Sequence, residues 1–208
     1  MATPSGTPVE EGARRVRVFE RSVAAWLTGG PIPEASAERA VLVEGASDRA
    51  AVVAVAESLD RDLASAGVAV LPMGGAMSVR RFVTVLGPQG LGLPLHGLCD
   101  RAELRYFTRA GLGPNAINVC DPDLEAELIR ALGVPGVEAV LEAEADLRLF
   151  RTFQQQPAQR GRNAEAQLHR FLGTTSGRKE HYARALAQAL PPDRIPPPLG
   201  ELVDAVSR

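Results

Sequence analysis

The segment Val41–Asp48, Val-Leu-Val-Glu-Gly-Ala-Ser-Asp, constrains the fold of this chain more than any other. Its first three residues are apolar and rich in β-branching, which is typical of a strand buried in a parallel sheet. A glycine turn follows, and Ser47 or Asp48 is a suitable N-cap for a helix over residues 49–66. Glu44 therefore lies at the carboxyl end of a first strand, where open α/β sheets bind ligands. Taken alone, these residues fit an ordinary strand–turn–helix with a solvated acid equally well.

Strands and helices alternate along the chain after this segment. Further strands are predicted at 68–71, in the residues that end at Asp100, and at 116–120, with helices at 79–86 and 103–109. Strands separated by helices are joined by right-handed crossovers. We therefore predict an α/β fold, with a parallel sheet of about four strands flanked by helices.

Helices dominate both ends of the chain. An amphipathic helix is predicted over residues 9–27, and a short one follows the proline-rich stretch near the C-terminus. The helices expected between the last strand and that stretch span residues 124–132, 134–150, 164–172 and 178–190. We expect an N-terminal arm and helix (1–37), an α/β core (38–133), and a C-terminal helical region that completes the site (134–208).

The composition limits the classes of function. The net charge is −2, so the molecule as a whole is not a polyanion binder and any nucleic-acid surface must be a local patch. Residues 1–12 contain no apolar core of a signal peptide, and no stretch approaches the length of a membrane span. Cys99 and Cys120 each end an apolar run, so we expect them to be small buried thiols of a reduced cytoplasm. A cytoplasmic protein without a membrane partner is expected.

Acidic residues follow the predicted strands. Glu44, Asp100 and Asp121 each come directly after one, and the segment 123–127 adds acids at the start of a helix. Because the carboxyl ends of parallel strands lie at one edge of the sheet, we expect these carboxylates to converge. Converging carboxylates repel one another, and a hard cation with oxygen ligands relieves that repulsion. For any single acid of 123–127, stabilisation of the helix N-terminus is an equally good reading.

The block Val41–Asp48, the strand-end Asp100 and Asp123-Leu124-Glu125 resemble the Toprim domain of the overcoming-lysogenization-defect (OLD) family of nucleases. The resemblance spans residues 38–190 and implies Mg²⁺ or Mn²⁺ as cofactor for phosphodiester chemistry. It also implies that Lys179, in a late helical segment, approaches the scissile phosphate. The metal ligands that the resemblance implies are Glu44, Asp48, Asp100 and Glu125, and Asp123 is a further candidate ligand.

Two features depart from the family pattern. The usual Asp-x-Asp pair after the third strand is Asp100-Arg101-Ala102-Glu103 here, and Ala102 cannot bind metal. Glu103 is one position later and one methylene longer, and we expect it to reach back into the site as a replacement ligand. The second departure is the ABC-type ATPase of OLD nucleases, which does not fit within residues 1–37. A separate ATPase of this type is therefore a candidate partner.

Other motifs carry weaker signals. Gly74-Gly75 follows the second strand, and a simple turn is favoured over a phosphate-binding loop. The segment 173–179 has the wrong spacing for an ATP-binding phosphate loop. His96, His169 and His181 are scattered, and we expect packing or surface roles for them. Arginines concentrate in the C-terminal region and form a candidate nucleic-acid track, although arginine-rich surfaces are also routine. These arginines are Arg148, Arg151, Arg160, Arg162, Arg170 and Arg178.

These observations together predict a metal-dependent phosphodiesterase, an OLD-like Toprim endonuclease acting on DNA. Glu44, Asp100 and Lys179 are the expected catalytic residues, and two ions about 4 Å apart would serve the reaction. One alternative is a catalytically weak module that binds nucleic acid or an ATPase partner. Another is a primase-like nucleotidyltransferase, which uses similar acids with a nucleotide substrate.

Overall fold

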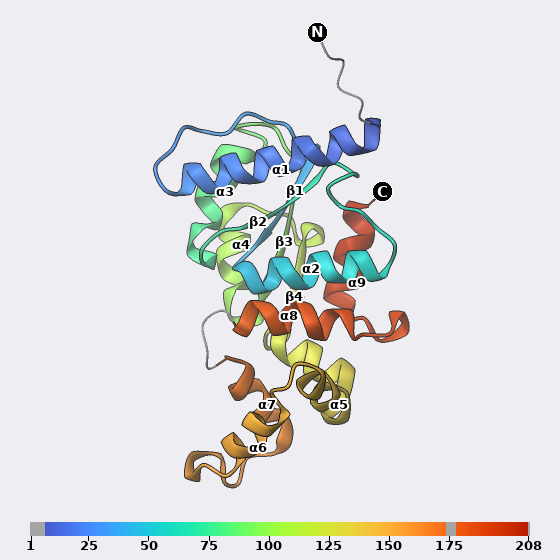
Figure 1. Ribbon diagram of the computed structural model, residues 1–208. Coiled ribbons are helices and arrows are strands. Elements are labelled where there is room, and N and C mark those ends of the chain that lie inside the picture. Colours follow the sequence, from blue (N-terminus) through green and yellow to red (C-terminus); the bar gives the residue numbers. More distant parts are fainter. Residues whose placement is uncertain (1–6, 174–177, 208) are drawn as a thin grey trace.

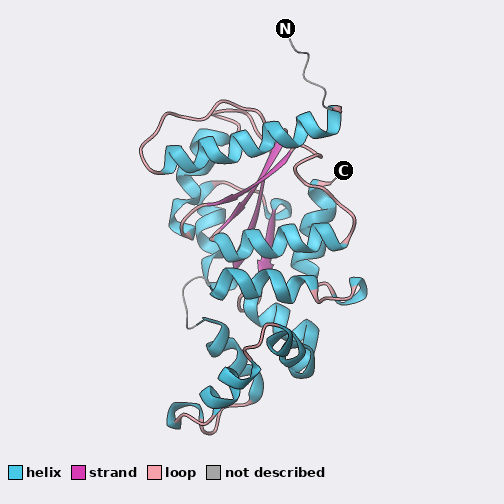
Figure 2. Ribbon diagram, in the orientation of Figure 1, coloured by secondary structure: helices cyan, strands magenta, loops and turns pink. Residues whose placement is uncertain are grey.

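The computed structural model describes residues 7–173 and 178–207 of the chain. Within them, four parallel strands form one sheet in the order β2–β1–β3–β4. The strands are β1 (Arg39–Val43), β2 (Val68–Pro72), β3 (Leu95–Asp100) and β4 (Ile117–Cys120). Helices cover both faces of this sheet (Figures 1 and 2). The predicted α/β fold, with its N-terminal helix and C-terminal helical extension, is confirmed.

Successive strands are added to one side of β1 first and then to the other, so the strand order reverses between β1 and β3. The chain passes from β1 outward to β2, returns to pair β3 with the other side of β1, and then adds β4 beyond it. In register, Leu42 of β1 lies opposite Leu71 of β2 and Gly97 of β3. Such a reversal opens a crevice at the carboxyl ends of the two central strands, where ligands bind in sheets of this kind.

Two hydrophobic cores hold the helices against the sheet. Alternate residues of β1 face opposite sides, so Val41 and Val43 enter one core while Ala40 and Leu42 enter the other. The second core is built with α1 (Pro8–Leu27), α3 (Val79–Leu86) and α4 (Leu104–Ala110). The first core is built with α2 (Ala46–Ser58), α5 (Leu124–Ala143), α6 (Leu147–Gln154), α7 (Ala164–Gly173), α8 (Arg178–Gln188) and α9 (Pro197–Val206). Short 3₁₀ turns span Ala76–Ser78, Arg101–Glu103, Pro114–Ala116, Pro157–Gln159 and Pro192–Arg194.

Local sequence explains why α1 forms and how it docks. Thr7 caps the helix by accepting from the backbone N–H of Glu10, whose carboxylate in turn accepts from the N–H of Thr7. Buried side chains recur every three or four residues, which is the spacing of one helix face. They are Ala13, Val16, Phe19, Val23 and Trp26. The predicted helix over 9–27 is therefore confirmed.

Two helices end earlier than predicted, and for the same reason. The helix predicted over 49–66 stops at Ser58, because Asp60 adopts a left-handed backbone (φ 55°) and the N–H of Arg61 donates to the carbonyl of Ala56. The helix predicted over 134–150 is likewise broken after residue 143, with Ala145 at φ 59°. Both ends are Schellman caps, which glycine usually forms. Neither contains glycine, so the sequence carries no stop signal.

Three further expectations can be compared with the structure. Gly45, not Ser47 or Asp48, is the N-cap of α2, so that prediction was wrong. Cys99 and Cys120 are buried free thiols, as predicted. Every helix within the described ranges is too short or too polar to cross a membrane. The division into three regions at residues 37 and 133 stays a prediction.

Candidate metal centre

Glu44 and Asp48 lie at the carboxyl end of β1, at the reversal of the strand order. Glu44 is the first residue after the strand and is partly buried. Asp48 lies in the first turn of α2, where its Oδ2 accepts from the backbone N–H of Gly45 at 2.8 Å. This bond fixes the turn and holds the Asp48 carboxylate at the edge of the sheet. The turn at Gly75 closes over the same place, because its N–H donates to the carbonyl of Glu44 at 3.0 Å.

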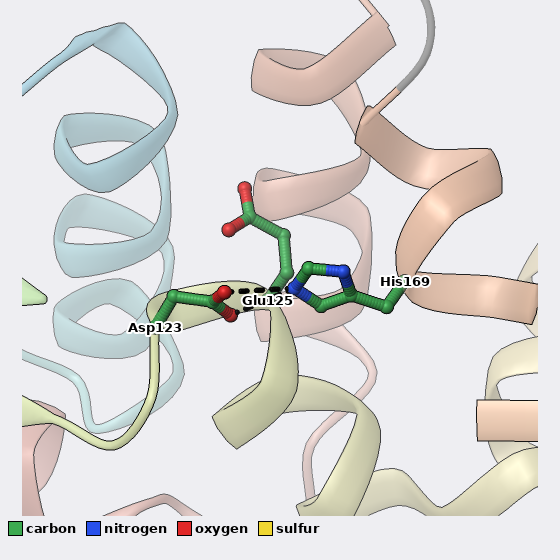
Figure 3. A group of neighbouring side chains, drawn as sticks. All are labelled: Asp123, Glu125 and His169. Atoms are coloured by element: carbon green, nitrogen blue, oxygen red, sulfur yellow. Dashed lines mark hydrogen bonds and ion pairs between the residues drawn. The ribbon is translucent and has the colours of Figure 1, made fainter. Parts of the chain in front are cut away.

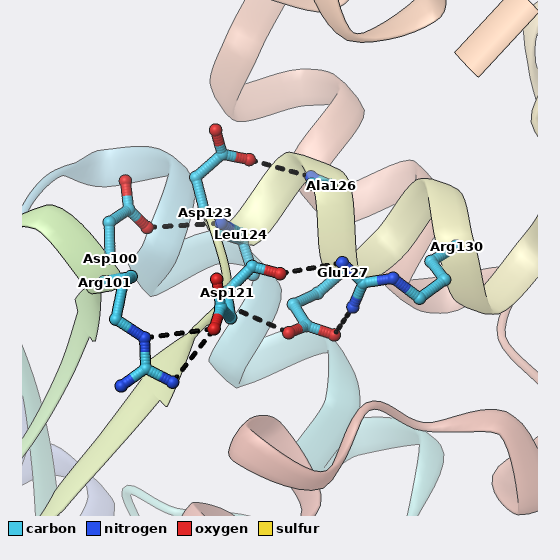
Figure 4. A network of polar contacts seen from close by, with 8 residues as sticks. All are labelled: Asp100, Arg101, Asp121, Asp123, Leu124, Ala126, Glu127 and Arg130. Carbon is cyan, nitrogen blue, oxygen red and sulfur yellow. Dashed lines mark hydrogen bonds and ion pairs between the residues drawn. The ribbon is translucent and has the colours of Figure 1, made fainter. Parts of the chain in front are cut away.

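Asp100 and Glu103 enter from the neighbouring strand β3. Asp100 is the last residue of β3, and its Oδ1 accepts from the backbone N–H of Leu124 at 3.2 Å (Figure 4). Glu103 follows in the 3₁₀ turn, and its carboxylate lies close enough to that of Glu44 to raise the pKa of Glu44. Glu103 Oε2 is buried, and no donor among the described residues reaches it. Glu103 thus turns back to the site, beside Glu44.

Asp123, Glu125 and His169 form a third group on the first turn of α5 and on α7 (Figure 3). The Nε2 atom of His169 lies 2.8 and 3.0 Å from the two carboxylate oxygens of Asp123. One potential ligand atom from each of the three side chains lies within 4.8 Å of the others. Asp123 also caps α5 by accepting from the N–H of Ala126 at 2.9 Å. A helix cap therefore fixes the position of this group.

Lys179 completes the centre from the start of α8. Its ammonium lies 3.1 Å from Glu125 Oε1, and its side chain is 49% exposed. Burial lowers the pKa of Lys179, but the charge of Glu125 and then those of Asp48 and Asp100 outweigh burial and raise it. Lys179 is therefore a cation among carboxylates that also reaches solvent. Residues 174–177 of the predicted late lysine segment lie outside the described residues.

Burial and mutual repulsion raise the pKa values of the central acids. The contact with Glu103, followed by burial, raises the pKa of Glu44 to about 7. Burial raises the pKa of Asp48 to about 6 and that of Asp100 to about 7, and Asp48 and Asp123 add to the rise at Asp100. Glu125 contributes to all three increases. The acids therefore share one electrostatic environment, as their positions after the strands predicted.

Two predicted acids do not join this group. The expectation that Asp121 converges with Glu44 and Asp100 was wrong, because its exposed carboxylate pairs with Arg101 at 3.0 Å (Figure 4). Glu127 is buried, but its oxygens accept from the N–H of Asp121 at 3.0 Å and from Arg130 at 2.8 Å. Glu127 thus fastens the end of β4 to α5 and has a structural role.

The family model for the Toprim domain of overcoming-lysogenization-defect-like proteins matches residues 37–101. Residues 37–101 therefore belong to an OLD-like Toprim domain. The matched segment includes Glu44, Asp48 and Asp100, while Glu103, Glu125 and Lys179 lie beyond it. These last three residues are therefore placed by the structure of this chain and not by the family model.

Solved structures extend the likeness to most of the chain. The C-terminal region of the Burkholderia pseudomallei OLD protein has a TM-score of 0.59 at 23% identity, covering 82% of this chain and 96% of that one. The corresponding region of the Xanthomonas campestris pv. campestris OLD protein has a TM-score of 0.60 at 25% identity, covering 82% and 95%. A comparison with curated proteins gives no match. The helices around the Toprim sheet therefore share the fold of these C-terminal regions.

Sequence reasoning missed His169. The expectation of a packing or surface role overlooked its pairing with Asp123, which lies 46 residues away in the sequence. No motif surrounds His169, and only the packing of α7 against α5 brings the two side chains together. His181, in contrast, is exposed and pairs with Glu144 at 2.7 Å, as expected of a surface histidine.

The raised pKa values predict how metal and pH act together on the stability of this Toprim domain. Because the folded pKa values of Glu44, Asp48 and Asp100 exceed the ordinary values of 4.5 and 3.8, their contribution to stability is complete at acid pH and is lost as pH rises through about 6 to 7. A divalent cation takes the place of the missing protons. We expect the rise in melting temperature on adding Mg²⁺ or Mn²⁺ to be larger at about pH 8 than at about pH 5, by roughly 3 °C or more. A rise that is equal or larger at acid pH would contradict this prediction.

Proposed function

We propose that this chain is a divalent-metal-dependent phosphodiesterase that cleaves DNA. The observation that carries the proposal is the gathering of Glu44, Asp48 and Asp100 at the reversal of the strand order, with Lys179 beside them. The presence of an OLD-like Toprim domain supports a nuclease-type enzyme with a nucleic-acid substrate. The buried free thiols of Cys99 and Cys120 support a cytoplasmic setting.

The residues of the centre fit Mg²⁺ or Mn²⁺. Carboxylate oxygens are the ligands that these ions prefer. The pKa of Glu44 is raised first by its contact with Glu103, and the pKa values of Asp48 and Asp100 are raised first by burial. Neighbouring carboxylates add to all three rises, and a cation would compensate their negative charge. Glu103 Oε2 is buried, and no hydrogen-bond donor among the described residues reaches it. Glu125 Oε1 is also buried, with the Lys179 ammonium 3.1 Å away. These acids, together with Asp123, are the proposed ligands.

Each part of the centre has a separate task in the proposed reaction. When bound, divalent ions would supply Lewis acidity, which activates a water and stabilises the leaving oxygen. Lys179 would hold the scissile phosphate, because its half-exposed ammonium can move from Glu125 to a substrate oxygen. The partly buried carboxylates would hold the ions in place before DNA arrives, so little rearrangement would accompany the reaction.

Plasmid nicking tests the proposal. Supercoiled DNA is incubated with the protein and Mg²⁺ or Mn²⁺, with and without EDTA. We expect conversion to nicked or linear DNA that EDTA stops. A templated nucleotide-incorporation assay on the same preparation separates hydrolysis from primase-like synthesis. Incorporation of nucleotides without nicking, or nicking that survives EDTA, would overturn the proposal.

Ala102 favours a second candidate function. Ala102 occupies the sequence position of the usual second aspartate and cannot bind metal, so this Toprim domain would be a weak catalyst that binds DNA or a separate ABC-type ATPase. DNA binding measured by fluorescence anisotropy, without nicking under any metal condition, would favour this candidate. The exposed arginines of α6 and α7 and the loop between them would then be the first surface to mutate. They are Arg148, Arg151, Arg160, Arg162 and Arg170.

The role of Glu103 leads to a rescue experiment. Glu103→Ala should lower metal-dependent cleavage at least about tenfold, or ~1.4 kcal/mol of barrier, because it removes the carboxylate that turns back to Glu44. Adding Ala102→Asp to that variant restores the Asp-x-Asp spacing and should recover much of the rate. Full nicking activity in Glu103→Ala would show that Glu103 is no ligand.

A further inference from the structure

The group at the α5–α7 contact contains a nitrogen ligand. His169 Nε2 lies 2.8 Å from one Asp123 oxygen and 3.0 Å from the other, and a Glu125 oxygen is within 4.8 Å of both partners' ligand atoms. Two atoms each about 2.1 Å from a shared ion lie at most about 4.2 Å apart. A small rotation of side chains therefore suffices for all three groups to bind one ion. In Figure 3 the Asp123 carboxylate and the His169 ring point toward one another.

Glu125 is the buried carboxylate of this group. Its side chain is only 11% exposed, and the Lys179 ammonium lies 3.1 Å from its Oε1 atom. A buried carboxylate is stable only with positive charge close by. Because a carboxylate has two oxygens, Lys179 and an ion can each use one.

An imidazole ligand changes which ion the group prefers. Mg²⁺ and Ca²⁺ favour all-oxygen ligands, whereas first-row transition ions accept imidazole nitrogen readily. Mn²⁺ is the member of that series that also suits carboxylates. The donor set of two carboxylates and one imidazole therefore selects against Mg²⁺.

We propose that Asp123, Glu125 and His169 form a site for a first-row transition ion, Mn²⁺ above Mg²⁺, with His169 Nε2 as a direct ligand. A catalytic role for this ion rests on the proposed function, because the site is part of the same centre. Binding of the ion itself can be measured without any substrate.

Pulsed electron paramagnetic resonance of the Mn²⁺-loaded full chain tests the ligand directly. Electron spin-echo modulation from ¹⁴N should be present in the wild type and absent in His169→Gln. His181→Gln is the matched control, since His181 pairs with Glu144 at 2.7 Å on the surface and should leave the modulation unchanged. Modulation missing from the wild type, or unchanged in His169→Gln, would overturn the proposal.

Affinities give a second readout. His169→Gln should weaken Mn²⁺ binding at least about tenfold, while Mg²⁺ binding, measured by competition, should change less than about twofold. Asp123→Asn should also weaken Mn²⁺, and it keeps the helix cap, because asparagine caps as well as aspartate. Circular dichroism and thermal melting check that both variants fold. An equal loss of affinity for the two ions would contradict the proposed selectivity.

The outcomes separate this inference from the proposed function. If His169 gives nitrogen modulation but the protein never cleaves DNA, the proposed metal site is supported and the proposed nuclease function is wrong. If the protein cleaves DNA with Mg²⁺ but its Mn²⁺ spectrum shows no nitrogen modulation, the nuclease function is supported and His169 is not a metal ligand. In that case His169 is only an ion-pair partner of Asp123.

Discussion

Glu44→Gln should reduce metal-dependent DNA cleavage at least about 100-fold, equivalent to ~2.7 kcal/mol of barrier. Glutamine keeps the size of the side chain but removes one charge from the group formed with Asp48 and Asp100. It also removes the carboxylate beside Glu103. The same variant should lose most of the rise in melting temperature that Mg²⁺ or Mn²⁺ causes, because the ion would no longer bind the folded site tightly.

Glu57→Gln is the matched control for Glu44→Gln. Glu57 lies on the neighbouring helix α2, is exposed, and pairs with Arg184 at 2.8 Å. A surface pair of this kind contributes little to stability, so this variant should cleave DNA and respond to metal as the wild type does. An unchanged metal-induced shift in Glu44→Gln would remove Glu44 from the proposed site.

Lys179→Ala should lower cleavage at least about tenfold, or ~1.4 kcal/mol of barrier, while the fold and metal binding are retained. Lys179 is the only lysine among 23 basic residues of the chain, and its ammonium lies 3.1 Å from Glu125. A compact ammonium with rotatable donors can stabilise the negative charge that develops on a phosphate in the transition state. A planar guanidinium has donors in a fixed geometry and is not equivalent. Lys179→Arg should therefore fail to restore the full rate.

Arg184→Ala supplies the control on the same helix. Arg184 of α8 also pairs with a glutamate, Glu57 at 2.8 Å, but this pair is exposed and lies outside the group of acids. The rate of Arg184→Ala should stay within about twofold of the wild-type rate. If Lys179→Ala and Lys179→Arg both cleave DNA at the wild-type rate, in a preparation that Glu44→Gln inactivates, then Lys179 is only a surface charge.

The strands and the acids that follow them were predictable from the sequence. Apolar runs such as Val41–Val43 are buried on both faces of a parallel sheet, so they are visible without any knowledge of the fold. Glu44 and Asp100 converge because parallel strands end at a common edge, which is a property of the topology alone. Lys179 was predicted through the resemblance to OLD nucleases, with its being the only lysine among 23 basic residues as a weaker signal.

Other features depend on contacts that the sequence does not encode locally. Asp121 follows a strand as Glu44 does, but a salt bridge with Arg101 holds it outside the group of acids. The ends of α2 and α5 use left-handed Asp60 and Ala145 in place of glycine, so the usual stop signal is missing. His169 joins the centre through the packing of α7 on α5, across 46 residues of chain.

Anomalous X-ray scattering from crystals grown with Mn²⁺ tests the central claim most directly. The claim is that the carboxylates gathered at the ends of β1 and β3 hold a divalent ion. An anomalous peak should lie about 2.2 Å from carboxylate oxygens of Glu44, Asp48 or Asp100. Well-ordered side chains at this place without an anomalous peak among them, at a Mn²⁺ concentration that supports DNA cleavage, would contradict the account.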